Sequence, residues 1–329
     1  ILCVIENPRT MKNFKITFII LAMVIISSCR SGNDHQGELS MFDNTLITEA
    51  KNLIGLKFYT AEQYMMKGNL SDYLGSYEGL RKIHLENSVA PALIFRPLIG
   101  QTNLVSQGEC QFLPYPELKR PESDVDLAFM TVGQLSWLYR TGQVSSVELT
   151  NIYLDRLIRH NDSLNCIVTL TENLALEQAR QADKDFAEGN YHGPLHGIPY
   201  GVKDILSTVG YKTTWGAMPF KDQILGYDAT VIKKLENAGA ILVAKLAMGA
   251  LAWGDVWYAG ETRNPWDLNA TSGGSSSGPT SATVAGLVPF SIGSETWGSI
   301  VEPSTICGAT GLRPTFGRVS RHGAMTLSW

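Results

Sequence analysis

The chain has 329 residues, of which 44% are hydrophobic and 18% charged, and its formal net charge is −4. This apolar content excludes a chain that is disordered throughout, and the length suffices for one large domain or two small ones. The weak negative charge, together with the lack of any run of lysine and arginine, argues against a nucleic-acid partner.

The six histidines and five cysteines are scattered along the chain. They form neither the HExxH pattern nor paired CxxC spacings, so we predict no metal site and no disulfide framework. Cys166 and Cys307 lie among apolar residues and are expected to be small side chains of the core.

Residues 1–29 indicate an export signal. Residues 11–15 form a basic start, and the apolar run 16–26 is too short, at about 1.5 Å per residue, to cross a hydrocarbon core of about 30 Å. Residues 26–29 (ISSC) resemble the lipobox of bacterial lipoproteins, which predicts a lipidated Cys29 and an exported, periplasmic or cell-envelope protein held at the membrane only by lipid. Residues 1–10 then precede the natural start. A cytosolic protein with an apolar N-terminal helix is the alternative.

Residues 30–123 are expected to be a tether and an extension that carry no chemistry. A helical pattern covers about residues 48–67, and an irregular stretch rich in proline and glycine follows it. Sharper patterns begin near residue 124, so one further domain is predicted over residues 124–329.

Two amphipathic helices are predicted early in this domain. The first begins at a capping box, residues 145–148, and places one apolar face on Leu149, Ile152, Tyr153 and Leu157. The second ends at Gly189-Asn190 and has an apolar face made of Ala175, Ala179, Ala182 and Phe186.

A strand–helix–strand pattern follows. Residues 197–204 predict a short strand, residues 230–238 a helix that stops at Gly239, and residues 240–244 a strand buried on both faces. This order predicts an α/β layered domain.

Residues 271–279, TSGGSSSGP, form an unusual run of glycine and serine. Its composition fits a flexible linker, although the apolar residues 284–292 that follow look buried. The run also contains the G-x-S-x-G pattern of the nucleophile elbow of α/β-hydrolases, centred on Ser276. That motif requires a preceding strand, for which residues 269–272 are a poor candidate, and a downstream histidine, for which this chain offers His322.

Two further features suggest chemistry. The small residues of segment 293–300 surround Ser299 and would let backbone N–H groups approach a substrate oxygen, although a tight turn explains them equally well. Lys203 ends an apolar strand, where burial can lower its pKa and leave a neutral amine able to act as a general base. Most lysines are solvated instead, so Lys203 alone is weak evidence.

Together these segments resemble the amidase signature family. GIPYGVKD at 197–204 and TRNPW at 262–266 resemble the family's GIP..VKD and TRNPW, and GGSSSG at 273–278 resembles its GGSSGG. GSETWGSI at 293–300 resembles its GTETDGSI or GTDTGGSI, and CGATGLRPTFGRVS at 307–320 resembles its CG..GLKPT.GRVS, all in the family's order. The resemblance covers about residues 125–329 and implies an α/β fold whose mixed β-sheet core is covered by helices on both faces. Members of the family continue well beyond the last motif, so we expect an N-terminal fragment whose C-terminal part is missing.

The resemblance implies a serine–serine–lysine triad. It makes Lys203 the base, Ser275 a bridging serine that follows a cis Gly274–Ser275 peptide, and Ser299 the nucleophile. The implied reaction is hydrolysis of a small-molecule carboxylic amide, other than a peptide bond, through an acyl-enzyme. The implied reaction requires neither a metal nor an organic cofactor. The resemblance leaves undecided whether the protein forms a homodimer.

The resemblance also places an oxyanion hole on the backbone N–H groups of Thr296, Trp297, Gly298 and Ser299, and it gives Ser276 a supporting role. Trp297 departs from the family, which has a small residue or aspartate there. Val301 stands where many relatives carry arginine, which argues against a glutamine amidotransferase. Because Trp297 is large, the alternative function is a catalytically silent, lipid-anchored binding protein whose pocket this ring blocks.

Overall fold

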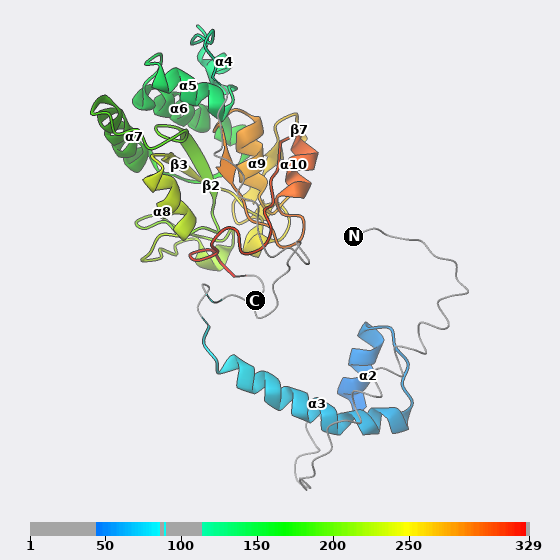
Figure 1. Ribbon diagram of the computed structural model, residues 1–329. Helices are drawn as coiled ribbons and strands as arrows, with labels where there is room; N and C mark the ends of the chain where they lie inside the picture. Colours follow the sequence, from blue (N-terminus) through cyan, green and yellow to red (C-terminus); the bar gives the residue numbers. More distant parts are fainter. Residues whose placement is uncertain (1–43, 86–88, 90–113, 327–329) are drawn as a thin grey trace, which may run out of the picture. The chain divides into compact units, whose positions relative to one another are not determined.

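The computed structural model describes residues 44–85, 89 and 114–326, which divide into two compact units between His84 and Leu85 (Figure 1). The predicted export signal, with Cys29, lies outside these residues. Within the described ranges, no helix combines the length and the apolar character that a membrane span requires. The boundary predicted near residue 124 stays a prediction.

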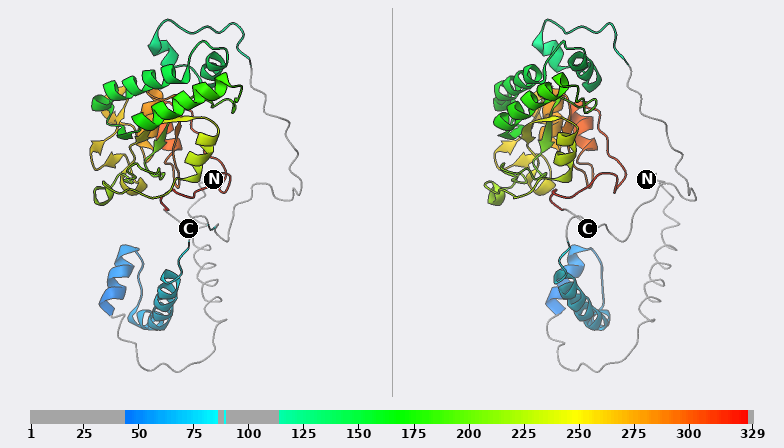
Figure 2. Two further views of the ribbon diagram at one scale, coloured as in Figure 1. Left: turned by 90° about the vertical axis from the view of Figure 1, so that its left-hand side faces the viewer. Right: turned by 60° about the vertical axis from the view of Figure 1, so that its left-hand side comes forward.

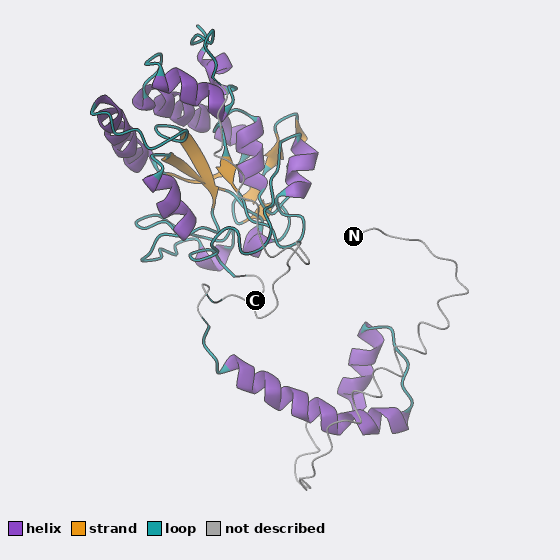
Figure 3. Cartoon of the chain, in the orientation of Figure 1, coloured by secondary structure: helices purple, strands orange, loops and turns teal. Residues whose placement is uncertain are grey.

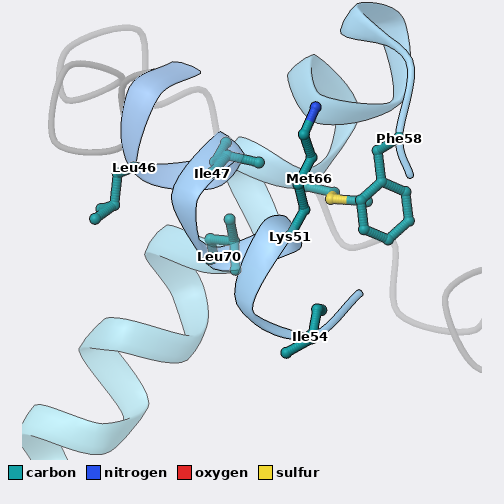
Figure 4. Close-up of a pocket in the computed structure, with 8 residues that line it drawn as sticks. Leu46, Ile47, Lys51, Ile54, Phe58, Met66 and Leu70 are labelled. Atoms are coloured by element: carbon teal, nitrogen blue, oxygen red, sulfur yellow. The ribbon is translucent and has the colours of Figure 1, made fainter. Parts of the chain in front are cut away.

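The first unit contains helix α2 (Asn44–Leu53) and helix α3 (Thr60–Arg81). The single helical stretch expected over residues 48–67 is therefore wrong, because the chain turns at Gly55, whose φ of 70° is left-handed. The irregular stretch expected after residue 67 is also wrong as far as residue 81, since α3 continues through three glycines. Figure 4 shows the apolar pocket of this unit, lined by Leu46, Ile47, Ala50, Lys51, Ile54, Phe58, Met66 and Leu70.

The second unit is built on a four-stranded mixed sheet. Its order is β1 (Ile167–Leu170), β3 (Ile241–Leu246), β2 (Pro199–Lys203) and β8 (Ser291–Ile292). Strand β1 is antiparallel to β3, whereas β2 is parallel to both β3 and β8. The mixed α/β fold expected from the family resemblance is thereby confirmed.

Helices pack on both faces of this sheet (Figures 1 and 3). On one face Val243 packs with α6 (Ser146–Leu164), α7 (Glu172–Ala187) and α9 (Ser277–Val284), and Figure 2 shows the green helices α6 and α7 side by side. On the other face Leu242 packs with α8 (Thr230–Asn237). Neighbouring residues of β3 thus serve opposite faces, which explains its continuous apolar run.

The remaining elements of this unit are short. Helices α4 (Asp124–Ala128) and α5 (Val132–Arg140) precede α6, and α10 (Val301–Cys307) follows β8. Two single-turn 3-10 helices cover Met218–Phe220 and Ala250–Ala252. Two small antiparallel sheets pair β4 (Val256–Trp257) with β5 (Gly260–Glu261), and β6 (Arg263–Asn264) with β7 (Asp267–Thr271).

The predicted helices and strands of this unit are confirmed, with one difference at the start of α6. The Ser145 hydroxyl accepts a hydrogen bond from the Glu148 N–H, as a capping box requires. The Glu148 carboxylate, however, accepts from Arg120 instead of from the backbone of Ser145. Cys166 and Cys307 are buried and free, as expected.

The glycine–serine run is not a linker. Residues 272–279 are buried, and α9 begins within them at Ser277. The expectation that residues 269–272 make a poor strand is also wrong, because β7 reaches Thr271 by pairing with β6. At Gly278 an added Cβ would lie 2.4 Å from the backbone N of Ala247, so only glycine permits this close approach to the end of β3.

Candidate active site

Lys203, the last residue of β2, is fully buried. Its Nζ lies 2.8 Å from Ser275 Oγ, 3.1 Å from Ser276 Oγ and 3.2 Å from the carbonyl oxygen of Ser294. Burial lowers the pKa of Lys203 to about 7, although the Glu295 carboxylate opposes this shift. Near pH 7 a large share of the amine is therefore neutral and able to accept a proton from the Ser275 hydroxyl.

Ser276 is held by backbone groups on two sides. Its hydroxyl donates to the Ser294 carbonyl (3.1 Å) and accepts from the Ser294 N–H (3.2 Å), and its own N–H donates to the carbonyl of Ser299 (3.0 Å). With the added bond from Lys203, this buried hydroxyl has no free direction toward a substrate. These contacts suit a supporting residue better than the elbow nucleophile.

Ser275 follows a cis Gly274–Ser275 peptide, as the family resemblance implied. Its carbonyl accepts a hydrogen bond from the N–H of Gly249 at 3.3 Å. A Cβ added at Gly274 or at Gly249 would lie 1.9 Å from the carbonyl oxygen of Gly254. Segment 249–254 is therefore packed backbone to backbone against the segment that carries Ser275.

Ser299 lies half-buried between β8 and α10. Its carbonyl binds the Ser276 N–H, but within the part of the chain that the structure describes its hydroxyl makes no hydrogen bond. The structure thus gathers Lys203, Ser275 and Ser276 into one cluster and joins Ser299 to it through the backbone. The roles assigned to these side chains stay predictions.

The segment predicted to form an oxyanion hole, residues 296–299, turns sharply and, within the described part of the chain, leaves several backbone N–H groups without a protein acceptor. Gly298 has a φ of 92°, a left-handed conformation that favours glycine, and the chain turns there. Among the described residues, the N–H groups of Thr296, Trp297 and Ser299 donate to no protein acceptor, whereas that of Gly298 faces the Glu295 carboxylate. Three of the four predicted donors are therefore free to bind a substrate oxygen.

Glu295 is a site residue that the sequence motifs did not indicate. One carboxylate oxygen accepts from the N–H groups of Ile300 (2.8 Å) and Val301 (2.9 Å), and the other lies 3.3 Å from Arg313. Burial alone would raise the pKa of Glu295, but the backbone N–H groups around the start of α10 and Arg313 lower it overall. An acidic residue just before a helix was the available signal.

A second cluster of titratable groups joins Asp185, His192 and His196. His196 Nδ1 accepts from the His192 N–H at 3.0 Å, so its Nε2 must donate to the Ala182 carbonyl at 3.1 Å. Both ring nitrogens of His196 are engaged, and a metal could bind there only after one of these bonds broke. Motif spacing could not show this cluster, because a turn after α7 brings its members together.

The fold and the site together define a class of protein: a mixed α/β domain in which a buried lysine is hydrogen-bonded to two neighbouring serines. The family model described as Amidase matches residues 148–328, which is more than half of the chain. The chain therefore belongs to the amidase family, as its motifs indicated.

Named relatives agree with this placement. The chain is 44% identical over 201 residues to a glutamyl-tRNA(Gln) amidotransferase subunit of Coxiella burnetii, covering 60% of this chain and 41% of that protein. The peptide amidase of Stenotrophomonas maltophilia superposes with a TM-score of 0.58 at 33% identity, covering 60% and 43%. A fatty acid amide hydrolase superposes with a TM-score of 0.60 at 28% identity, covering 63% and 37%. The chain thus spans less than half the length of these relatives.

Proposed function

We propose that the complete protein hydrolyses a small carboxylic amide, other than a peptide bond, with Ser299 as nucleophile, Ser275 as proton relay and Lys203 as base. The observation that carries this proposal is the buried Lys203 Nζ, 2.8 Å from Ser275 Oγ, with a pKa lowered to about 7. A lysine with this pKa can act as a base at neutral pH without a histidine.

The proposed reaction begins when Ser299 Oγ attacks the amide carbonyl. Its proton passes to Ser275 Oγ while the Ser275 proton passes to Lys203 Nζ, and the free N–H groups of Thr296, Trp297 and Ser299 stabilise the developing oxyanion. The relay then returns the proton to the amide nitrogen, the C–N bond breaks and the amine leaves. Water attacks the acyl-enzyme by the same proton route and releases the carboxylic acid.

We also propose that the protein is exported and that lipid on Cys29 anchors it to a membrane. The lipobox-like ISSC segment at residues 26–29 supports this proposal. The alternative of a silent binding protein required the Trp297 ring to block the pocket. That ring is 83% exposed and stacks on Trp253, so the alternative is not favoured.

Labelling with a fluorophosphonate probe tests the assignment of the nucleophile. We expect the complete gene product to form one adduct, located on Ser299 by mass spectrometry of the labelled peptide, and Ser299→Ala to form none. Thr305→Ala, a change of an exposed hydroxyl on α10, is the control and should label normally. An adduct on Ser276 would overturn the assignment in favour of the elbow mechanism.

Glu295→Gln should move the acid limb of the labelling rate to lower pH. Burial lowers the pKa of Lys203, and the negative charge of Glu295 partly offsets this effect. Removing that charge should therefore lower the pKa of Lys203 further. The plateau rate above this limb should fall, because the contacts to Ile300 and Val301 weaken. Glu302→Gln, which changes an exposed carboxylate of α10, is the matched control. A limb that stays in place or moves to higher pH contradicts the expectation.

A further inference from the structure

Two exposed tryptophans stand together beside the candidate site. The side chains of Trp253 and Trp297 are 75% and 83% exposed, and their rings stack with centroids 6.4 Å apart and planes inclined by 26°. A single exposed apolar side chain needs no explanation, but two of the largest ones side by side form an apolar surface. Among the described residues, neither ring packs against another aromatic ring or a cation.

Both rings are fixed to the segments that carry the reacting groups. Trp297 lies two residues before Ser299, in the segment that Glu295 ties to α10. Trp253 belongs to segment 249–254, which donates to the Ser275 carbonyl from Gly249 and packs its Gly254 carbonyl against Gly274. The pair therefore joins the nucleophile segment to the relay segment.

This connection constrains the substrate of the proposed reaction. A carbonyl carbon bonded to Ser299 Oγ, with its oxygen on the free N–H groups of Thr296, Trp297 and Ser299, lies within a side-chain length of Trp297. One of the two substituents of the amide can then reach the exposed indole of Trp297. Each indole face is flat, so a planar substituent covers more of it than a puckered one.

We propose that Trp253 and Trp297 form an aromatic subsite that selects amides bearing a planar aromatic group. The inference rests on the proposed function, since it requires chemistry at Ser299. Aromatic pairs gain energy beyond area burial at centroid separations of about 4.5–7 Å, so an aromatic substrate ring is favoured over a saturated ring of equal size. Trp297, which departs from the family pattern, is on this account a specificity residue.

The test compares two fluorophosphonate probes that differ only in a phenylethyl or a cyclohexylethyl arm. The cyclohexyl arm has the same number of carbons and is the more apolar, so general apolar attraction cannot favour the phenyl probe, and a ratio of second-order labelling rates in favour of phenyl reports ring stacking. For the complete gene product we expect a preference of about tenfold for the phenyl probe. Trp253→Leu and Trp297→Leu should each bring the ratio close to one, whereas Trp253→Phe and Trp297→Phe should keep most of it.

Trp266→Leu is the control, because Trp266 is also exposed, at 77%, but lies outside the pair. Its ratio should stay near that of the wild type. Labelling of Ser299 with equal rates for both probes, or a ratio that the leucine variants leave unchanged, overturns the subsite and leaves the proposed function intact. A folded wild type that neither probe labels overturns the proposed function and the subsite with it.

Discussion

Lys203→Met should slow the acylation of Ser299 by about 10²–10⁴-fold, because methionine fills a similar volume but cannot accept a proton. The substitution removes the proposed base, which lies 2.8 Å from Ser275 Oγ, and leaves the proposed nucleophile and its free N–H groups in place. The measurement is the second-order rate of fluorophosphonate labelling, followed by hydrolysis of any amide found to be a substrate. A variant that labels at the wild-type rate above pH 8 would remove Lys203 from the mechanism.

The wild-type rate should depend on pH in a defined direction. Since only the neutral amine accepts a proton, the labelling rate should rise about tenfold per pH unit below pH 7 and level off above it. Lys203→Met should lose this limb. A flat profile between pH 5 and 7 in the wild type contradicts the assignment.

The same pKa predicts how stability changes with pH. The pKa of Lys203 falls from 10.5 to about 7 on folding, so between these values the unfolded chain binds more protons than the folded one. The unfolding free energy of the wild type should therefore rise with pH across this window, by about 5 kcal/mol relative to Lys203→Met. Below pH 7 the full cost of burying the amine is present and the difference is constant. Urea unfolding of both proteins at pH 6 and pH 10 should capture about 4 kcal/mol of this rise, because the window extends to pH 10.5.

Lys245→Met should destabilise the protein by about 3–5 kcal/mol, because it leaves the buried Asp204 carboxylate without its counter-ion. Lys245 Nζ lies 2.9 Å from Asp204 Oδ1, and both side chains are fully buried. Burial raises the pKa of Asp204 and lowers that of Lys245, so each charge depends on the other. Lys245 also donates to the carbonyl of Lys212 at 2.6 Å, and Asp204 accepts from the Thr214 N–H at 2.7 Å.

The measurement is urea unfolding of Lys245→Met, Asp204→Leu and the double variant. The double variant should recover part of the loss, since it leaves no unpaired buried charge. Lys212→Met supplies the control, because its ion pair with Asp222 has nearly the same length, 2.8 Å, but is exposed. It should cause no measurable loss. Equal losses at the two pairs would show that burial does not set the strength of this interaction.

This ion pair also affects the candidate site. Asp204 follows Lys203 at the end of β2, and its N–H donates to the carbonyl of Leu246 at the end of β3. The pair thus joins the ends of the two strands next to the base. We expect the Asp204→Leu and Lys245→Met variants to unfold more easily and also to react more slowly with the fluorophosphonate probe.

Much of this protein was determined by local sequence. The elements over residues 145–164, 172–187 and 230–246 were readable because apolar spacing and capping residues act within a few positions. Family motifs led to the proposed roles of Lys203, Ser275 and Ser299, because glycine and serine in a set order are typical of the family's signature. Membership of the amidase family followed from the same motifs.

Other features were decided only by tertiary structure. The glycine–serine run resembled a linker because its composition carries no apolar pattern, and its burial comes from packing against β3 and segment 249–254. Residues 48–67 looked like one helix because the left-handed turn at Gly55 leaves the apolar spacing almost unbroken. The contacts of Glu295, the Asp204–Lys245 pair and the Trp253–Trp297 pair each join residues from separate segments. Spacing along one segment cannot report such contacts, because their energies depend on distance and burial in the folded chain.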